Sequence, residues 1–298
     1  MILEHLLPSI RDIALLPPEE RIAKLYNDYW IGYSRAVQAL KRLEDLLHFP
    51  KRIRMPNMLL ISPTNNGKTM IVEKFRRQHL PYESEDENHE IVPVLIVQMP
   101  SSPTIQRFYF AIFAALGSPV VSYSSTAKSE AMALKLLKVT QTKVLIIDEI
   151  HNLLAGRIDK QREFLNVLRF LGNELQISIV GVGTKDAYLA IRSDDQLENR
   201  FEPFILPLWN NDTEFVRLLV SFQKILPLQQ PSDLLDLDIR FLILTRSEKT
   251  IGEIASLLIQ ATKLAIQSGK ERIDFNVLEQ AEYQSPTERR KTYESMIY

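Results

Sequence analysis

The sequence predicts an α/β fold in which a parallel sheet of five strands lies between helices. Short apolar segments with the length and β-branched content of strands lie near residues 58–62, 92–98, 144–148, 177–182 and 203–206. Segments of helical periodicity separate them, for example residues 105–113 and 164–171. Strands that alternate with amphipathic helices are typical of a parallel sheet covered on both faces.

The first of these apolar segments runs directly into a loop suited to phosphate binding. Such a loop needs inward-facing backbone N–H groups, a lysine for the β- and γ-phosphates and a hydroxyl for Mg²⁺. Gly67, Lys68 and Thr69 occupy those places. We therefore expect ATP and Mg²⁺ as cofactors, with the nucleotide held by Ser62, Pro63, Thr64, Asn65, Asn66, Gly67, Lys68 and Thr69.

The loop departs from the usual pattern at its first position. Ser62 stands where that pattern has a glycine, so the first turn must accept a Cβ. On the loop alone, a strand–turn–helix with an incidental Gly-Lys-Thr is an alternative.

Two carboxylates at the end of another apolar segment favour the nucleotide site. Asp148 and Glu149 directly follow residues 144–147. Because ligands of open parallel sheets bind at the carboxyl ends of strands, these carboxylates can face the phosphate loop. Asp148 would hold Mg²⁺ together with Thr69, and Glu149 would orient and deprotonate the attacking water. A strand that ends in acidic residues is weak evidence for a nucleotide site by itself. Together with a phosphate loop at the same edge of the sheet, it indicates nucleotide hydrolysis.

The strand between the two motifs, and the glutamate directly after the magnesium aspartate, are typical of AAA+ ATPases. Thr184 follows the segment 177–182 and matches their first sensor, a polar residue that contacts the γ-phosphate or the attacking water. The alternative for Thr184 is the N-cap of a helix that begins at Lys185. The sequence leaves both roles open.

Composition is that of an ordinary globular protein. Of its residues, 45% are hydrophobic and 24% are charged. The length of 298 residues is enough for more than one domain. The absence of cysteine excludes disulfides and thiolate chemistry and fits the cytoplasm, where we expect the protein. The longest apolar run, from Phe108 to Leu116, is nine residues and too short to span a bilayer, so we expect no membrane association. The net charge of −1 offers no broad basic face, so any DNA contact must be local.

Changes in pattern along the chain predict its organisation. Residues 1–50 read as an N-terminal helical cap, and residues 51–207 hold the α/β pattern. Strand patterns disappear afterwards, which predicts a helical lid over residues 208–283 and a C-terminal tail over 284–298. The acidic segment 83–90 reads as a solvated loop.

Several segments of the sequence match motifs of one protein family. They are residues 54–60, 64–69, 148–156, 182–184 and 199–201. Together they resemble the TniB/TnsC family, the AAA+ ATP-binding regulators of DNA transposition. The Asn-Asn-Gly-Lys-Thr loop and the Asp-Glu-Ile-His strand end are more specific than generic AAA+ motifs, and the resemblance extends from residues 30–33 to 251–254.

The resemblance implies a homo-oligomer, a ring or a helical filament, that assembles on double-stranded DNA when ATP is bound. It also implies two protein partners, a DDE transposase of the TniA/TnsB kind and a TniQ-like targeting protein. Arg200 matches the family's arginine finger, which projects onto the γ-phosphate held by the next subunit. The alternative for Arg200 is an ordinary ion pair, and Arg192 is a second candidate.

One position departs from many AAA+ lids, which place a second sensor arginine soon after a glycine. Here Glu253 follows Gly252, and the nearest cations are Arg246 and Lys249. One positive group fewer near the γ-phosphate predicts slow hydrolysis. The alternative is that Gly252 and Glu253 only begin a packed helix.

For DNA, the resemblance points to residues 100–107 and 122–128. These segments offer hydroxyl, amide and ammonium groups that suit phosphate contacts, at Ser102, Thr104, Gln106, Ser124, Ser125 and Lys128. The alternative is solvated loops with helix N-caps at Thr104 and Thr126. The basic cluster of residues 289–291 in the tail would contact DNA, a neighbouring subunit or the targeting protein, or be disordered.

Two other functions remain open from the sequence. One is a helicase-loader-like AAA+ ATPase of DNA replication. The other is an ATP-gated DNA scaffold with negligible hydrolysis, in which Glu149 is present but seldom used.

Overall fold

The computed structural model describes residues 3–27, 29–86, 88–119, 125–155, 157–192 and 198–297. The chain divides into two compact units. The α/β unit holds Arg35–Thr64 and Lys68–Pro207, and the helical unit holds Met1–Ser34, Asn65–Gly67 and Leu208–Tyr298. This division groups the residues differently from the four parts expected from the sequence, whose boundaries stay predictions.

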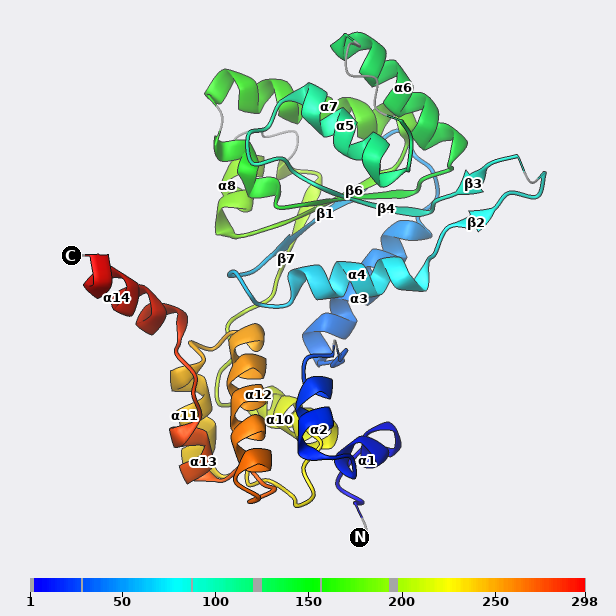
Figure 1. The fold of residues 1–298 in the computed structure, drawn as a ribbon. Helices are drawn as coiled ribbons and strands as arrows, with labels where there is room; N and C mark the ends of the chain where they lie inside the picture. The colour runs from blue at the N-terminus through cyan, green and yellow to red at the C-terminus, as the bar shows by residue number, and fades with distance from the viewer. Residues whose placement is uncertain are drawn as a thin grey trace. The chain divides into compact units, whose positions relative to one another are not determined.

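The α/β unit is built on a sheet of five parallel strands in the order β4-β5-β6-β1-β7 (Figure 1). Their bounds are β1 Asn57–Ile61, β4 Val94–Gln98, β5 Val144–Asp148, β6 Ser178–Gly183 and β7 Phe201–Ile205. Every residue of β1 and β6 is buried, which is why these segments read as continuous apolar runs rather than alternating ones. The predicted fold class is confirmed.

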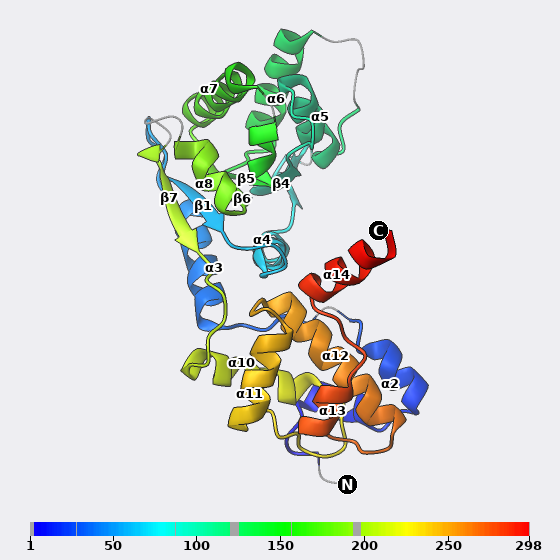
Figure 2. The same ribbon diagram turned by 90° about the vertical axis from the view of Figure 1, so that its left-hand side faces the viewer.

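Helices cover both faces of this sheet (Figures 1 and 2). One face carries α3 Ser34–Leu47 and α4 Lys68–Gln78, and the other carries α5 Ile105–Ala115, α6 Thr126–Val139 and α7 Ile158–Leu175. The 3₁₀ helix η1 Ile150–Ala155 follows β5, and α8 Lys185–Arg192 follows β6. Apolar residues of α5 and α7, such as Phe108 and Leu168, share one buried core with Leu145 of β5.

The acidic segment differs from the prediction. Instead of a loop, β2 Tyr82–Glu83 and β3 Glu90–Ile91 form a short antiparallel pair, with Glu83 opposite Glu90. Both glutamates are exposed, so their side chains are solvated as expected. The pairing was missed because two like charges directly opposite are unfavourable.

The helical unit contains α1 Pro8–Ala14, α2 Pro18–Lys24, α10 Thr213–Ile225, α11 Leu237–Arg246, α12 Ile251–Gln267 and α13 Phe275–Gln280. Phe215 of α10, Leu257 of α12 and Leu278 of α13 lie in one buried core. Buried Arg21 of α2 donates to both carboxylate oxygens of Glu271, at 2.8 and 2.7 Å. Among the described residues, no helix is long and apolar enough to cross a bilayer.

The segment expected to be a tail contains the helix α14 Pro286–Ile297. Ser285 and Glu288 cap its start reciprocally: the Ser285 N–H donates to Glu288 Oε2 at 2.7 Å, and the Glu288 N–H donates to Ser285 Oγ at 3.2 Å. Upstream, the Arg246 guanidinium donates to the carbonyls of Leu278, Glu279, Ala281 and Tyr283. Arg246 therefore fixes the path of the chain that leads to α14.

Candidate nucleotide-binding site

The predicted site residues of the α/β unit gather at the carboxyl edge of its sheet. Ile61, at the end of β1, pairs in register with Gly183 at the end of β6. Thr184 follows β6 directly, and Asp148 is the last residue of β5. Lys68 and Thr69 begin α4, the helix that follows the loop after β1.

Thr69 and Asp148 meet at this edge. The Thr69 hydroxyl donates to Asp148 Oδ2 at 3.1 Å, and the other carboxylate oxygen accepts the Glu149 N–H at 2.8 Å. Magnesium prefers oxygen ligands, and in nucleotide sites it takes one or two from the protein and the rest from phosphates and water. A hydroxyl and a carboxylate in direct contact fit such a metal.

Lys68 lies inside its own loop. Its Nζ donates to the Ser62 carbonyl at 3.0 Å, to Ser62 Oγ at 3.3 Å and to the Pro63 carbonyl at 2.8 Å. Burial lowers the pKa of the Lys68 ammonium below its ordinary value, while the charges of Glu149 and Asp148 act in the opposite direction. The ammonium thus has carbonyl partners at the place where phosphate oxygens would compete for it.

The serine at the first position of the loop is compatible with its backbone. Positive φ angles fall later in the loop, at Asn65 (58°) and Gly67 (85°), and not at Ser62. Only those two positions need the conformation that favours glycine and asparagine.

Glu149 has a partner that the sequence reasoning missed. Its Oε2 lies 3.1 Å from Nε2 of His151, and the backbone of Glu149 has a φ of 55°. The spacing in Asp-Glu-Ile-His was the available signal, because η1 begins immediately and turns His151 back towards the carboxylate. The general-base candidate is therefore oriented by a neighbouring ring.

Thr184 does not cap α8. Its Oγ1 is buried and has no hydrogen-bond partner in the part of the chain that the structure describes. Buried hydroxyls are nearly always bonded, so an orphan at the carboxyl edge fits a group that receives its partner with a ligand. The N-cap alternative is wrong for this side chain.

Open space adjoins these groups. A groove of about 550 Å³ is lined by Thr69, Asp148 and Glu149, together with residues of α4 and β4 that include Glu73, Arg76 and Gln98.

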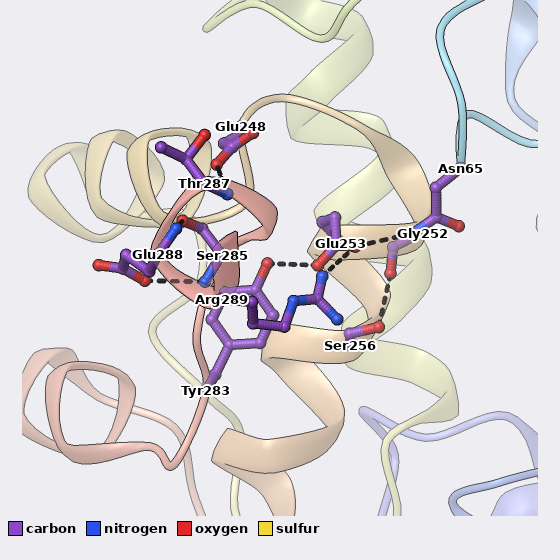
Figure 3. A network of polar contacts seen from close by, with 10 residues as sticks. All are labelled: Asn65, Glu248, Gly252, Glu253, Ser256, Tyr283, Ser285, Thr287, Glu288 and Arg289. Atoms are coloured by element: carbon purple, nitrogen blue, oxygen red, sulfur yellow. Dashed lines mark hydrogen bonds and ion pairs between the residues drawn. The ribbon is translucent and has the colours of Figure 1, made fainter. Parts of the chain in front are cut away.

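The tip of the phosphate loop, Asn65–Gly67, belongs to the helical unit and caps α12. The Ile251 N–H donates to Asn66 Oδ1 at 3.2 Å, and the Gly252 N–H donates to the Asn65 carbonyl at 3.0 Å. Thr250, at the N-cap position, makes no capping bond itself. A Cβ on Gly252 would lie 1.9 Å from Asn65 Oδ1, so the paired asparagines of the loop require glycine in the helix (Figure 3).

Arg200 lies at the opposite, amino edge of the sheet. Its carbonyl accepts the N–H of Asn57, the first residue of β1, at 3.0 Å. The four steps along β1 to Ile61 span about 13 Å, so Arg200 is separated from the phosphate loop of its own chain by the length of a strand. Its guanidinium donates to Asn173 at 2.8 Å. The second candidate, Arg192, pairs with Glu198 at 3.8 Å.

The DNA candidates lie around the first turns of α5 and α6. Thr104 caps α5 by accepting the Arg107 N–H at 3.2 Å. Ser125 caps α6 by accepting the Lys128 N–H at 3.4 Å, so the predicted cap at Thr126 is wrong. Gln106 links the helix starts by donating to Ser129 at 2.8 Å.

The DNA-binding candidates differ in their exposure to solvent. Ser102, Thr104, Ser125 and Lys128 are exposed, whereas Gln106 is half-buried. Arg107, also exposed, was missed by the sequence reasoning, and it donates to the Ser102 carbonyl at 3.2 Å. Ser124 lies outside the described residues.

The model of a family described as "Bacterial TniB protein" matches residues 21–211, more than half of the chain. Among curated proteins, none matches.

Several solved structures share the fold. The ORC2 protein of Aeropyrum pernix in ADPNP-ADP complexes has a TM-score of 0.60 at 18% identity and covers 87% of this chain and 70% of its own. The ORC1 protein of the same organism, in complex with DNA, has a TM-score of 0.59 at 17% identity, with coverage of 91% and 68%. Cdc6p of Pyrobaculum aerophilum has a TM-score of 0.56 at 16% identity, with coverage of 84% and 67%. These are AAA+ proteins, and the likeness confirms the AAA+ fold.

Proposed function

Because the chain belongs to the TniB family, we propose that it is an ATP-dependent regulator of DNA transposition. In this proposal it assembles as a homo-oligomer on double-stranded target DNA and recruits or activates a DDE transposase. A TniQ-like protein would connect it to target selection. Hydrolysis of ATP to ADP and phosphate is slow and is stimulated by assembly, DNA or the transposase.

The observation that carries the nucleotide part is the contact between Thr69 and Asp148, which come from different motifs 79 residues apart. These two residues would hold Mg²⁺, which when bound neutralises charge on the phosphates. Lys68 would exchange its carbonyl partners for β- and γ-phosphate oxygens. Glu149 would orient the attacking water and take its proton, and the Thr184 hydroxyl would donate to the γ-phosphate or hold that water.

Assembly is supported by the position of Arg200. A guanidinium at the amino edge is on the wrong side of its own sheet to reach a phosphate at the carboxyl edge. A second copy can supply it, and a finger given in trans stabilises the charge that develops during phosphoryl transfer. Hydrolysis would then depend on contact between subunits.

DNA binding is supported by the paired starts of α5 and α6. Helix N-termini favour phosphate, and the exposed Thr104, Arg107, Ser125 and Lys128 add hydroxyl and cationic donors that do not read sequence. ORC1, which shares this fold, was solved in complex with DNA. Because the net charge of one subunit is only −1, affinity for DNA would come from many subunits on one duplex.

The test is the affinity for duplex DNA with and without a non-hydrolysable ATP analogue at fixed salt. We expect binding that requires the analogue, rises steeply with protein concentration, has little sequence preference and weakens with salt. Electron microscopy of the same mixture would display the oligomer. Tight binding by the monomer without nucleotide would contradict the proposal, and a preference for single strands would favour the replication-loader alternative.

A matched pair of variants tests the DNA surface. Lys128→Ala should weaken DNA binding and DNA-stimulated hydrolysis while leaving the basal rate unchanged. Lys135→Ala is the control, because Lys135 is an exposed cation of the same helix α6, further from its start. Equal losses from both changes would indicate a diffuse charge effect and not a surface at the helix starts.

A further inference from the structure

A buried carboxylate is bonded to the phosphate loop. Glu253 lies in the first turn of α12 and is 6% exposed. Its Oε1 accepts from Asn65 Nδ2 at 3.0 Å and from the Arg289 guanidinium at 2.8 Å, and its Oε2 accepts from the Tyr283 hydroxyl at 2.6 Å (Figure 3). One side chain therefore joins the loop to the C-terminal segment.

Only one of these three donors carries a charge. A buried carboxylate is costly unless it is paired and hydrogen-bonded. Burial, and after it the hydrogen bond to Glu253, raise the pKa of Tyr283, so its phenol stays a neutral donor. Asn65 is neutral as well. Arg289 therefore supplies the positive charge that balances Glu253 among its bonded partners.

Several hydrogen bonds fix the start of α14 and so position Arg289 beside Glu253. Glu248 accepts the Thr287 N–H at 2.8 Å, at the start of α14. The capping pair of Ser285 and Glu288 fixes the first turn, and Arg246 fixes the chain before it. Figure 3 shows the Arg289 side chain extending from this turn to Glu253. The side chain of Arg289 remains 54% exposed, so removing it leaves the core intact.

We propose that Arg289 is a positioning residue for nucleotide binding, which acts through Glu253 on Asn65 of the phosphate loop. This inference rests on the proposed nucleotide binding and adds a control from the C-terminal helix. Without Arg289, an unbalanced carboxylate remains bonded to the loop and repels the phosphates. The repulsion grows with ligand charge, so ATP is affected more than ADP.

The primary experiment compares Arg289→Ala with Arg290→Ala in the full-length protein, using fluorescent ATP and ADP analogues. Arg290 is the adjacent cation on the same helix, so both variants lose the same charge. We expect Arg289→Ala to weaken binding of the ATP analogue on the order of tenfold, within the range of couplings between linked sites, and binding of ADP by less. Arg290→Ala should match the wild type. Equal affinities for the two variants would overturn the inference.

A second comparison isolates the pathway through Glu253. In a Glu253→Gln background the negative charge is gone, so adding Arg289→Ala should change nucleotide affinity no further. Arg289→Lys in the native background should restore part of the affinity, because it keeps the charge. An unchanged tenfold loss in the Glu253→Gln background would show that Arg289 acts on the nucleotide by another route.

A readout without nucleotide separates this inference from the proposed function. Hydrogen exchange of residues 64–67 in the nucleotide-free protein should be faster in Arg289→Ala than in Arg290→Ala, since the loop loses part of its support. A wild type that binds no nucleotide would overturn the proposed function, while the exchange comparison still decides whether Arg289 positions the loop. Equal exchange in both variants would contradict the positioning role.

Discussion

The two edges of the parallel sheet carry different groups of the proposed reaction. At the carboxyl edge lie Lys68, Thr69, Asp148 and Glu149, which are proposed to hold the phosphates and activate water, and Thr184, whose buried hydroxyl has no partner among the described residues. At the amino edge lies Arg200, the proposed arginine finger. Under this proposal, a single chain carries both halves of the site at opposite edges of its sheet, where they do not meet.

The partners of these groups differ in the same way. Lys68 is buried, and its ammonium donates to the carbonyl oxygens of Ser62 and Pro63, where phosphate oxygens would compete for it. Arg200 instead donates to the side chain of Asn173 through a hydrogen bond that is exposed to solvent. In the proposed assembly, a neighbouring copy would draw the Arg200 guanidinium onto its own bound nucleotide. The proposal therefore makes ATP binding a property of one subunit and hydrolysis a property of two.

The largest expected effect comes from removing the cation of the carboxyl edge. Lys68→Ala should abolish ATP binding and, with it, assembly on DNA, because charged hydrogen bonds to phosphate are lost. Titration with a fluorescent ATP analogue measures this. Arg77→Ala, an exposed cation of the same helix, is the control and should bind normally. Unchanged affinity in a folded Lys68→Ala protein would exclude the loop as the nucleotide site.

The second expected effect comes from removing the arginine of the amino edge. Arg200→Ala should leave ATP binding intact and lower turnover on DNA by about 10³-fold, the lower range for an arginine finger. Mixing Arg200→Ala with Lys68→Ala subunits should restore part of the activity, because each supplies the half that the other lacks. If mixed assemblies form without any rescue, the finger does not act between subunits. Arg192→Ala, from the weaker candidate, should have a smaller effect.

The third effect separates binding from chemistry at the carboxyl edge. Glu149→Gln keeps a hydrogen-bonding side chain beside His151 but loses the base. Steady-state assays should therefore show turnover lower by about 10² or more, with ATP still bound and assemblies on DNA that persist. Turnover close to that of the wild type would mean that another group deprotonates the water.

The sequence predicted the sheet and its carboxyl edge because both depend on local patterns. Residues 57–61 and 144–148 are apolar strands followed by polar groups, and parallel strands bring such ends together whatever lies between them. The expectation that the first turn of the loop accepts the Cβ of Ser62 was likewise local, and it agrees with a backbone whose positive φ angles lie at Asn65 and Gly67. Pairings set only by tertiary packing were not predictable.

Glu253 is the clearest example of that limit. Because Glu253 stands where many AAA+ lids have an arginine, the sequence suggested one cation fewer near the nucleotide. In the structure Arg289, 36 residues later in the chain, forms an ion pair with Glu253. The pairing of His151 with Glu149 had a local signal in the spacing of Asp-Glu-Ile-His, but it also depends on where η1 begins. Ion pairs of this kind leave no periodic signal in the sequence.

The smallest expected effect concerns the orphan hydroxyl at the carboxyl edge. Thr184→Val removes a buried donor that has no partner among the described residues, so the free energy of unfolding should stay the same or rise by about 1 kcal/mol. Turnover should fall by about tenfold, less than for the base, because one contact to the γ-phosphate or the water is lost. Thr184→Ser keeps the hydroxyl and should retain activity. Thermal unfolding and steady-state hydrolysis of the two variants test whether the hydroxyl acts in hydrolysis. A Thr184→Val protein that is less stable but equally active would show that the hydroxyl is structural. Thr184 would then not be the sensor of the carboxyl edge.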